Sequence, residues 1–118
     1  EQDKDKLPDY AIVIPEDDPK MVNFYEALFY WQLANPGEKW KAYYSHENEF
    51  PSDDELDVLK GIIITGSFWG ANDDIEYIKR LCHNIEYVYE NFIHVKFYGG
   101  CFGHQIIAKA LGGKVESL

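Results

Sequence analysis

The sequence predicts an α/β domain built on a doubly wound parallel sheet. Short, continuous apolar runs such as YAIVI at 10–14 and GIIIT at 61–65 are typical of strands that are buried on both faces. Stretches with a helical period separate these runs, and turns rich in glycine or proline mark the boundaries. The length of 118 residues suits one domain with a substantial core.

The first half of the chain predicts two strands and a helix between them. Residues 1–9, EQDKDKLPD, have mixed charge and no period, so we expect a solvated lead-in, with one partial domain over 10–118. A strand over 10–14 is followed by Asp18 and Pro19, which suit the cap and first position of a helix reaching residue 34. Two adjacent apolar stripes predict that this helix is buried on a broad face; they comprise Val22, Tyr25, Phe29 and Leu33, and Met21, Phe24, Leu28 and Trp31.

The second half repeats the alternation of strand and helix. Side chains alternate over 40–44 as in a strand, and Ser52 with Glu55 has the spacing of a capping box that opens a short helix through Leu59. A third strand is predicted over 61–65, a helix from Ile75 to Phe92, a fourth strand over 93–98 and a last helix over 102–111.

The predicted strand order is flavodoxin-like, with the first strand between the second and third and the fourth beside the third. Ligands on such sheets bind at the carboxyl ends of the strands. A sheet that stops after the fourth strand leaves an apolar edge. We therefore expect a missing C-terminal part, or another chain, to lie against that edge.

Charge limits the classes of binding partner, and cysteine content bears on the cellular compartment. The chain has 21 acidic and 11 basic residues and a formal charge of -10, which repels nucleic acid and anionic membrane surfaces. Cys82 and Cys101 are too few for a disulfide scaffold, and no signal peptide is recognisable. We expect a cytoplasmic protein; a secreted one is the alternative, because the chain starts at Glu1 rather than at Met.

The segment GGCFGHQ at 99–105 carries the chemistry. Gly99 and Gly103 flank Cys101 between a predicted strand and a predicted helix, where a sharp turn lets a nucleophile project and the helix N-terminus favours a thiolate. The backbone N–H of Phe102 would face a developing oxyanion, and the loop at Gly66 and Ser67 could supply a second donor. The alternative is a small apolar cysteine in an ordinary glycine-rich connection.

Residues 99–108, followed by LGGKV at 111–115, resemble the nucleophile segment of the class I glutamine amidotransferase-like superfamily. Trp40, EFP at 49–51, Leu59 and GIIITGS at 61–67 are similar to its gamma-glutamyl peptidase branch. The resemblance runs from Tyr10 to the end of the chain. It implies the flavodoxin-like fold of that superfamily, here without its C-terminal part.

The resemblance also implies roles for individual residues. Cys101 matches the nucleophile that attacks the γ-carbonyl of glutamine or of a γ-glutamyl peptide and forms a thioester. Phe102 and Gly66 or Ser67 match the oxyanion donors, and Gln105 matches a residue that positions the glutamyl group, with a core or capping role as the alternative. No cofactor is implied, and no metal site is expected, because the sequence has no CxxC, no HExxH and no histidine pair with ligand spacing.

The sequence departs from the superfamily in its triad. Members supply a histidine and an acid from an H-P-E segment downstream, which this sequence lacks. His104 follows the turn directly and is better explained as a packed or exposed side chain; the other histidines, His46, His83 and His94, are scattered. Without a base the segment alone is expected to be nearly inactive. Gly100 stands where a branched apolar residue is usual, and Lys96 interrupts the fourth strand.

Three functions follow. The first is a cysteine hydrolase of γ-glutamyl amide or peptide bonds that needs residues beyond this chain for its histidine and glutamate. The second is a degenerate amidotransferase-like domain that serves as a binding or storage protein, which the missing base and Gly100 favour. The third is a glutaminase module that supplies ammonia to a synthase, against which stands the absence of a synthase segment.

Overall fold

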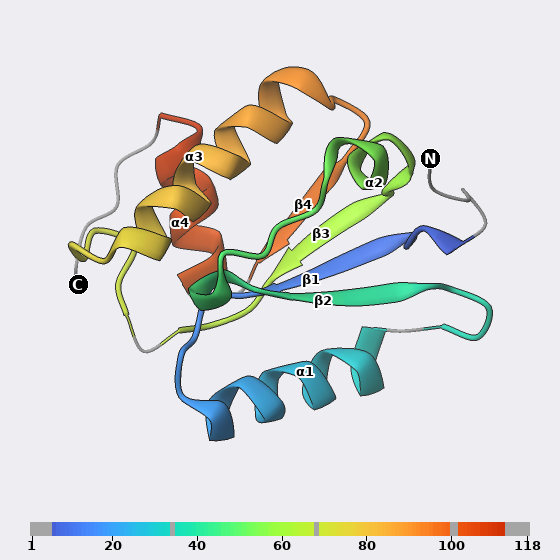
Figure 1. The fold of residues 1–118 in the computed structure, drawn as a ribbon, viewed down its shortest axis with the longest axis horizontal. Coiled ribbons are helices and arrows are strands. Elements are labelled where there is room, and N and C mark those ends of the chain that lie inside the picture. The colour runs from blue at the N-terminus through green and yellow to red at the C-terminus, as the bar shows by residue number, and fades with distance from the viewer. Residues whose placement is uncertain (1–5, 34, 68, 100–101, 113–118) are drawn as a thin grey trace.

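The computed structural model describes residues 6–33, 35–67, 69–99 and 102–112. Strands and helices alternate along the chain, and they form a sheet with helices on both sides (Figure 1). The elements in order are β1 (Tyr10–Ile14), α1 (Pro19–Leu33), β2 (Trp40–Tyr44), the short 3₁₀ helix η2 (Ser45–Glu47), α2 (Asp53–Val58), β3 (Gly61–Ile64), α3 (Glu76–Asn91), β4 (Lys96–Gly99) and α4 (Phe102–Ala110).

The sheet has the strand order β2-β1-β3-β4, and its neighbouring strands are parallel. This order confirms the prediction that the first strand lies between the second and third, and that the third and fourth strands are neighbours. In the register of the last pair, Gly61 lies opposite Lys96 and Ile64 opposite Gly99. The carboxyl ends of β3 and β4 therefore lie side by side.

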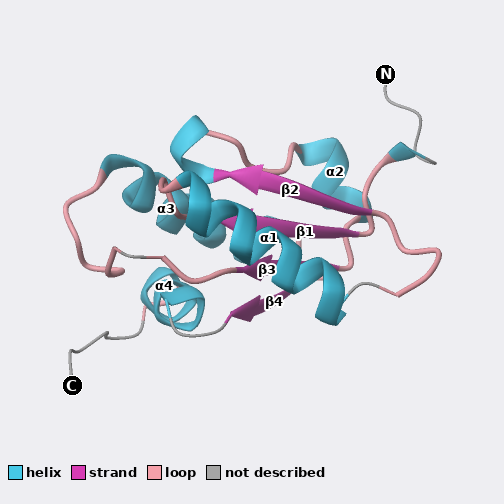
Figure 2. Ribbon diagram, turned by 90° about the horizontal axis from the view of Figure 1, so that it is seen from below, coloured by secondary structure: helices cyan, strands magenta, loops and turns pink. Residues whose placement is uncertain are grey.

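The two faces of the sheet are covered unequally. Figure 1 shows α3 and α4 on one side and α1 on the other. The larger core lies under α3 and α4 and takes alternate residues of the strands, including Ala11, Val13, Ile62 and Ile64. The smaller one lies under α1, which Figure 2 shows in front of the sheet, and consists of Ile12, Ile14 and Val22. Burial of both faces explains why β1 and β3 are continuous apolar runs.

Helix α1 corrects one prediction. Val22 is buried, but Met21 is 37% exposed and Phe24 is 54% exposed, so the broad buried face is wrong at these two positions. The physical reason is that α1 packs chiefly against β1, and none of the described elements covers its outer side. The predicted cap is present, because the Asp18 carboxylate accepts a hydrogen bond of 3.0 Å from the backbone N–H of Lys20.

Strand β4 corrects another prediction. It begins at Lys96 rather than at residue 93, and Ile93 is 90% exposed. The chain turns after α3, where the N–H of Val95 donates to the carbonyl of Phe92. Pairing with β3 starts only where the N–H of Lys96 reaches the carbonyl of Lys60. Strand β3 likewise ends at Ile64, one residue before the predicted end.

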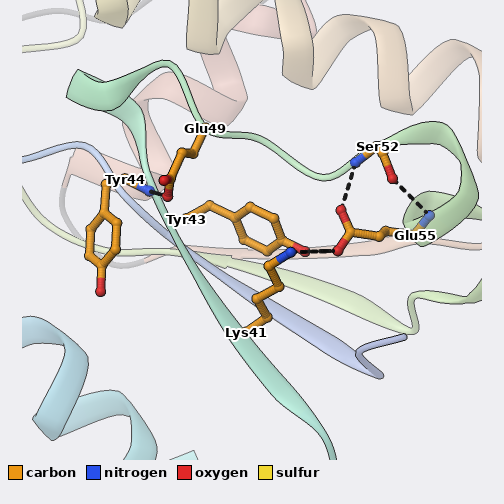
Figure 3. Close-up of polar contacts among 6 residues, drawn as sticks. All are labelled: Lys41, Tyr43, Tyr44, Glu49, Ser52 and Glu55. Atoms are coloured by element: carbon orange, nitrogen blue, oxygen red, sulfur yellow. Dashed lines mark hydrogen bonds and ion pairs between the residues drawn. The ribbon is translucent and has the colours of Figure 1, made fainter. Parts of the chain in front are cut away.

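The predicted capping box of α2 is present and belongs to a larger polar network (Figure 3). The Ser52 hydroxyl accepts from the N–H of Glu55, and the Glu55 carboxylate accepts from the N–H of Ser52 at 2.9 Å. The other Glu55 oxygen accepts from the Tyr43 hydroxyl at 2.8 Å and from the Lys41 ammonium at 3.0 Å. This buried carboxylate thereby joins α2 to β2.

No helix in the described part of the chain combines the length and the apolar character that a membrane crossing requires.

Candidate active site

The predicted site residues lie after β3 and after β4, at the carboxyl edge of the sheet. Gly66 and Ser67 follow β3 and are half-buried, while Gly99 ends β4 and Phe102 begins α4. Gly100 and the predicted nucleophile, Cys101, lie outside the described residues. The described residues on each side of the turn therefore define its frame: a strand end, a helix start and the neighbouring loop.

Helix α4 starts in direct contact with the end of β3. A Cβ atom added to Gly103 would lie 2.2 Å from the carbonyl oxygen of Ile64 and 3.0 Å from its carbonyl carbon. Backbone atoms cannot yield as a flexible side chain does, so only glycine fits at this position. The glycine after the turn thus allows α4 to approach β3 closely, and Phe102 beside it is buried.

The loop after β3 is held by its own hydrogen bonds. Thr65 is fully buried, and its N–H donates to the carbonyl of Val13 at 3.0 Å. The Thr65 hydroxyl donates to the carbonyl of Gly66 at 3.2 Å. The Ser67 hydroxyl accepts from the N–H of Trp69 at 3.2 Å. The Gly66–Ser67 loop, predicted to supply the second oxyanion donor from Gly66 or Ser67, is therefore tied to the strand on one side and to the following residues on the other.

Gln105 lies on α4 with an exposed side chain. Ile106, the next residue, is fully buried, which is the alternation expected on a helix that covers a sheet with one face. A core role for Gln105, one of the alternatives at the sequence level, is therefore wrong. The role of positioning a glutamyl group stays a prediction.

Three histidines, His46, His83 and His94, lie away from the ends of β3 and β4. His46 follows β2, where it lies 3.9 Å from the Glu47 carboxylate, and three strand spacings, about 14 Å, separate β2 from β4. His94 precedes β4, with Nε2 2.9 Å from the carbonyl oxygen of Leu56, and His83 is exposed on α3. Within the described ranges, no group of three or more His, Cys, Asp or Glu side chains could hold a metal ion.

Two acidic residues at the same edge were not singled out from the sequence. Glu16, directly after β1, is 1% exposed, and its carboxylate accepts from the N–H groups of Asp17 and Asp18. Burial, and then the charges of Asp17 and Glu16, raise the pKa of Tyr77 on α3 to about 12. The signal in the sequence is the run PEDD after a strand, which predicts a helix start and also places acidic side chains at this edge.

A cavity of about 240 Å³ opens beside these carboxylates. It lies at the ends of β1 and β2, against the start of α1, and its lining includes Asp17, Asn23, Tyr44, His46 and Glu47. The Tyr44 hydroxyl donates to the Glu26 carboxylate of α1 at 3.1 Å, so that β2 and α1 are tied together on this side. The cavity is thus polar and neighbours the carboxyl edge without reaching the end of β4.

The second cysteine has a different environment. Cys82 is half-buried on α3. Burial raises the pKa of the Cys82 thiol, the Lys109 ammonium opposes this shift, and the Glu86 carboxylate adds to it. Cys82 therefore has the properties of a packing residue.

Comparisons with known proteins agree with this architecture. The chain is 37% identical over 91 residues to gamma-glutamyl peptidase 4 of Arabidopsis thaliana, which covers 77% of this chain and 36% of that protein. It is 33% identical over 96 residues to gamma-glutamyl peptidase 2 of the same plant, covering 81% of this chain and 38% of the relative. The chain thus spans little more than a third of the length of these curated relatives.

A solved structure, that of a glutamine amido transferase from Methylobacillus flagellatus, has the same fold. The TM-score is 0.62 at 19% identity, and the match covers 92% of this chain and 40% of that one. The family model of glutamine amidotransferase class-I matches residues 21–118, a range that includes the β3 loop, the Cys101 turn and α4. The chain therefore belongs to the glutamine amidotransferase class-I family.

Proposed function

We propose that this chain carries the nucleophile half of a cysteine hydrolase that acts on γ-glutamyl amide or peptide bonds. The observation that carries the proposal is the contact of Gly103 with Ile64, together with the pairing of Ile64 with Gly99. These contacts hold the end of β3, the end of β4 and the start of α4 within one short stretch of the carboxyl edge. The names of the gamma-glutamyl peptidase relatives supply the substrate class.

In the proposed reaction the Cys101 thiolate attacks the γ-carbonyl carbon and forms a tetrahedral oxyanion. The N–H of Phe102 and an N–H of the Gly66–Ser67 loop donate to that oxygen. Collapse of the intermediate breaks the bond from carbon to nitrogen, and the amine leaves after gaining a proton. A thioester to Cys101 stays behind, and water cleaves it to release the γ-carboxylate and restore the thiol.

The free side of β4 is the proposed place for the rest of the machinery. In β4 three of four residues are exposed, whereas all four residues of β3 are buried. We propose that further polypeptide of the family domain lies against β4 and contributes the histidine and acid of the triad. The small share of the relatives' length that this chain spans supports this part of the proposal.

The test uses γ-glutamyl p-nitroanilide, whose leaving group needs little acid assistance. The 118-residue chain is expected to release nitroaniline in a burst of at most one equivalent, with a mass gain of one glutamyl group on the peptide that contains Cys101. Cys101→Ala abolishes the burst, and Cys82→Ala, the matched control, leaves it unchanged. A glutamyl adduct on another residue, or none in the unaltered chain, would overturn the proposal. Sustained turnover by this chain alone would contradict the need for further polypeptide.

A further inference from the structure

Tyr25, on the inner side of α1, lies against the loop that follows β3. A Cβ atom at Gly66 would lie 2.8 Å from the Tyr25 Oη, 3.1 Å from Cζ and 3.3 Å from Cε1. The hydroxyl end of Tyr25 therefore lies in the space where a Cβ at position 66 would stand. Neither the resemblance nor the comparisons assign a role to this tyrosine.

Helix α1 is fixed on both sides of Tyr25. Val22, one turn earlier, is buried against the sheet, and Glu26 accepts a hydrogen bond from the Tyr44 hydroxyl of β2. Asp18 caps the first turn of the helix. These contacts hold the segment of α1 that carries Tyr25 against the sheet.

The opposite side of the same peptide is held by Thr65. Its hydroxyl donates to the Gly66 carbonyl, and the structure has no cis peptide bond among the described residues. In a planar trans peptide the carbonyl and the next N–H point in opposite directions. Fixing the Gly66 carbonyl toward Thr65 therefore directs the Ser67 N–H away from Thr65.

We propose that Tyr25 is a positioning residue for the oxyanion donor: its ring packs against Gly66 and, with the Thr65 hydroxyl, fixes the plane of the Gly66–Ser67 peptide. The inference rests on the proposed function, because it concerns the oxyanion formed during acylation of Cys101. A Cβ at position 66 would require either the end of the Tyr25 side chain or the peptide to shift.

Two reactions of the same thiol separate this role from a general structural one. Acylation by γ-glutamyl p-nitroanilide passes through an oxyanion, whereas alkylation by iodoacetamide is a displacement at a saturated carbon that forms none. Tyr25→Ala is expected to lower the acylation rate about tenfold to a hundredfold and to leave the alkylation rate of Cys101 within about twofold. Tyr25→Phe, which retains the ring, is expected to lose less.

Two further variants serve as controls. Tyr89→Ala removes an exposed ring from α3 and is expected to change neither rate. Gly66→Ala lowers acylation in the native background, and Tyr25→Ala in the same chain recovers part of that loss because it makes room for the new Cβ. Equal losses of both rates in Tyr25→Ala, or no change in their ratio, would overturn the positioning role alone. A native chain that is alkylated but not acylated would overturn the proposed function and this inference with it.

Discussion

Replacement of Gly103 by alanine sets two physical effects against each other. Gly103 is the second residue of α4, and on helix propensity alone alanine is favoured over glycine by about 1 kcal/mol. The new Cβ would, however, lie 2.2 Å from the carbonyl oxygen of Ile64, whereas ordinary contacts of a Cβ begin near 3.4 Å. The start of α4 would have to move away from β3 by about 1 Å.

The steric effect is expected to outweigh the gain in propensity. Overpacking of this kind typically costs about 1–3 kcal/mol, and here the obstacle is backbone in a fully buried strand. Because the obstacle is backbone, we take the upper end of that range, about 3 kcal/mol, and expect Gly103→Ala to lower the free energy of unfolding by about 2 kcal/mol once the helix gain is subtracted. The displacement should also reduce acylation of Cys101, because Phe102 moves with the helix.

Urea unfolding followed by circular dichroism measures the loss of stability. Gly70→Ala is the matched control, because its Cβ would meet the Asp73 carboxylate only at 3.6 Å, an ordinary contact. That variant is expected to stay within about 0.5 kcal/mol of the native chain. If Gly103→Ala is as stable as the native chain or more stable, the close approach of α4 to β3 is wrong, and the frame of the proposed site fails with it.

Three more outcomes follow from the polar network and the cysteines. Burial raises the pKa of Glu55, but hydrogen bonds from the Ser52 N–H, Tyr43 and Lys41 outweigh it and leave the pKa below 4.5. The resulting stability is present above pH 4.5 and is lost on acidification. Glu55→Gln should therefore flatten the acid limb of a plot of stability against pH. Burial, and then the Glu55 carboxylate, raise the pKa of Tyr43 above its usual 10.0. The contribution of Tyr43 to the free energy of unfolding is therefore complete below pH 10 and is lost at higher pH. In urea titrations, Tyr43→Phe should lose less stability at alkaline pH than the native chain does. At about pH 6.5 iodoacetamide should label Cys101 well before Cys82, because burial raises the pKa of the Cys82 thiol. Peptide mass mapping that finds Cys82 labelled first would contradict this order.

The sequence predicted those elements correctly whose bounds depend on neighbouring residues alone. The runs at 10–14 and 40–44 became β1 and β2 with the same bounds, and the Ser52–Glu55 spacing produced a capping box. The predicted start of β4 at residue 93 is wrong, because the apolar run after α3 includes the turn that reverses the chain. The 3₁₀ helix η2 had no strong signal either; it ends at Glu47, and the next residue, Asn48, has a left-handed φ of 61° that asparagine tolerates.

In the candidate site, too, local features were predicted from the sequence and tertiary contacts were not. The glycine pattern around Cys101 predicted a turn between strand and helix, since the need for glycine is a local property of crowded backbone. The partners of that turn are tertiary, and no spacing in the sequence indicated that Tyr25 would reach Gly66 from a helix some forty residues earlier. Glu16 was overlooked for a similar reason: its burial depends on the elements that close over the end of β1.

The exposed part of the sheet and the incomplete part of the proposed site lie at the same strand. On the α1 side, a groove of about 240 Å³ reaches from Tyr10 and Trp40 to Ile63 and Tyr98, and Tyr98 is 52% exposed. Doubly wound sheets are stable when both faces are covered, and β4 has an apolar residue at this uncovered position. Polypeptide that covers Tyr98 and pairs with β4 would end beside the Cys101 turn, where acylation and thioester cleavage need a base. Under the proposed function, one docking event would complete both the core and the catalytic machinery, and folding of the domain and its activity would then be coupled.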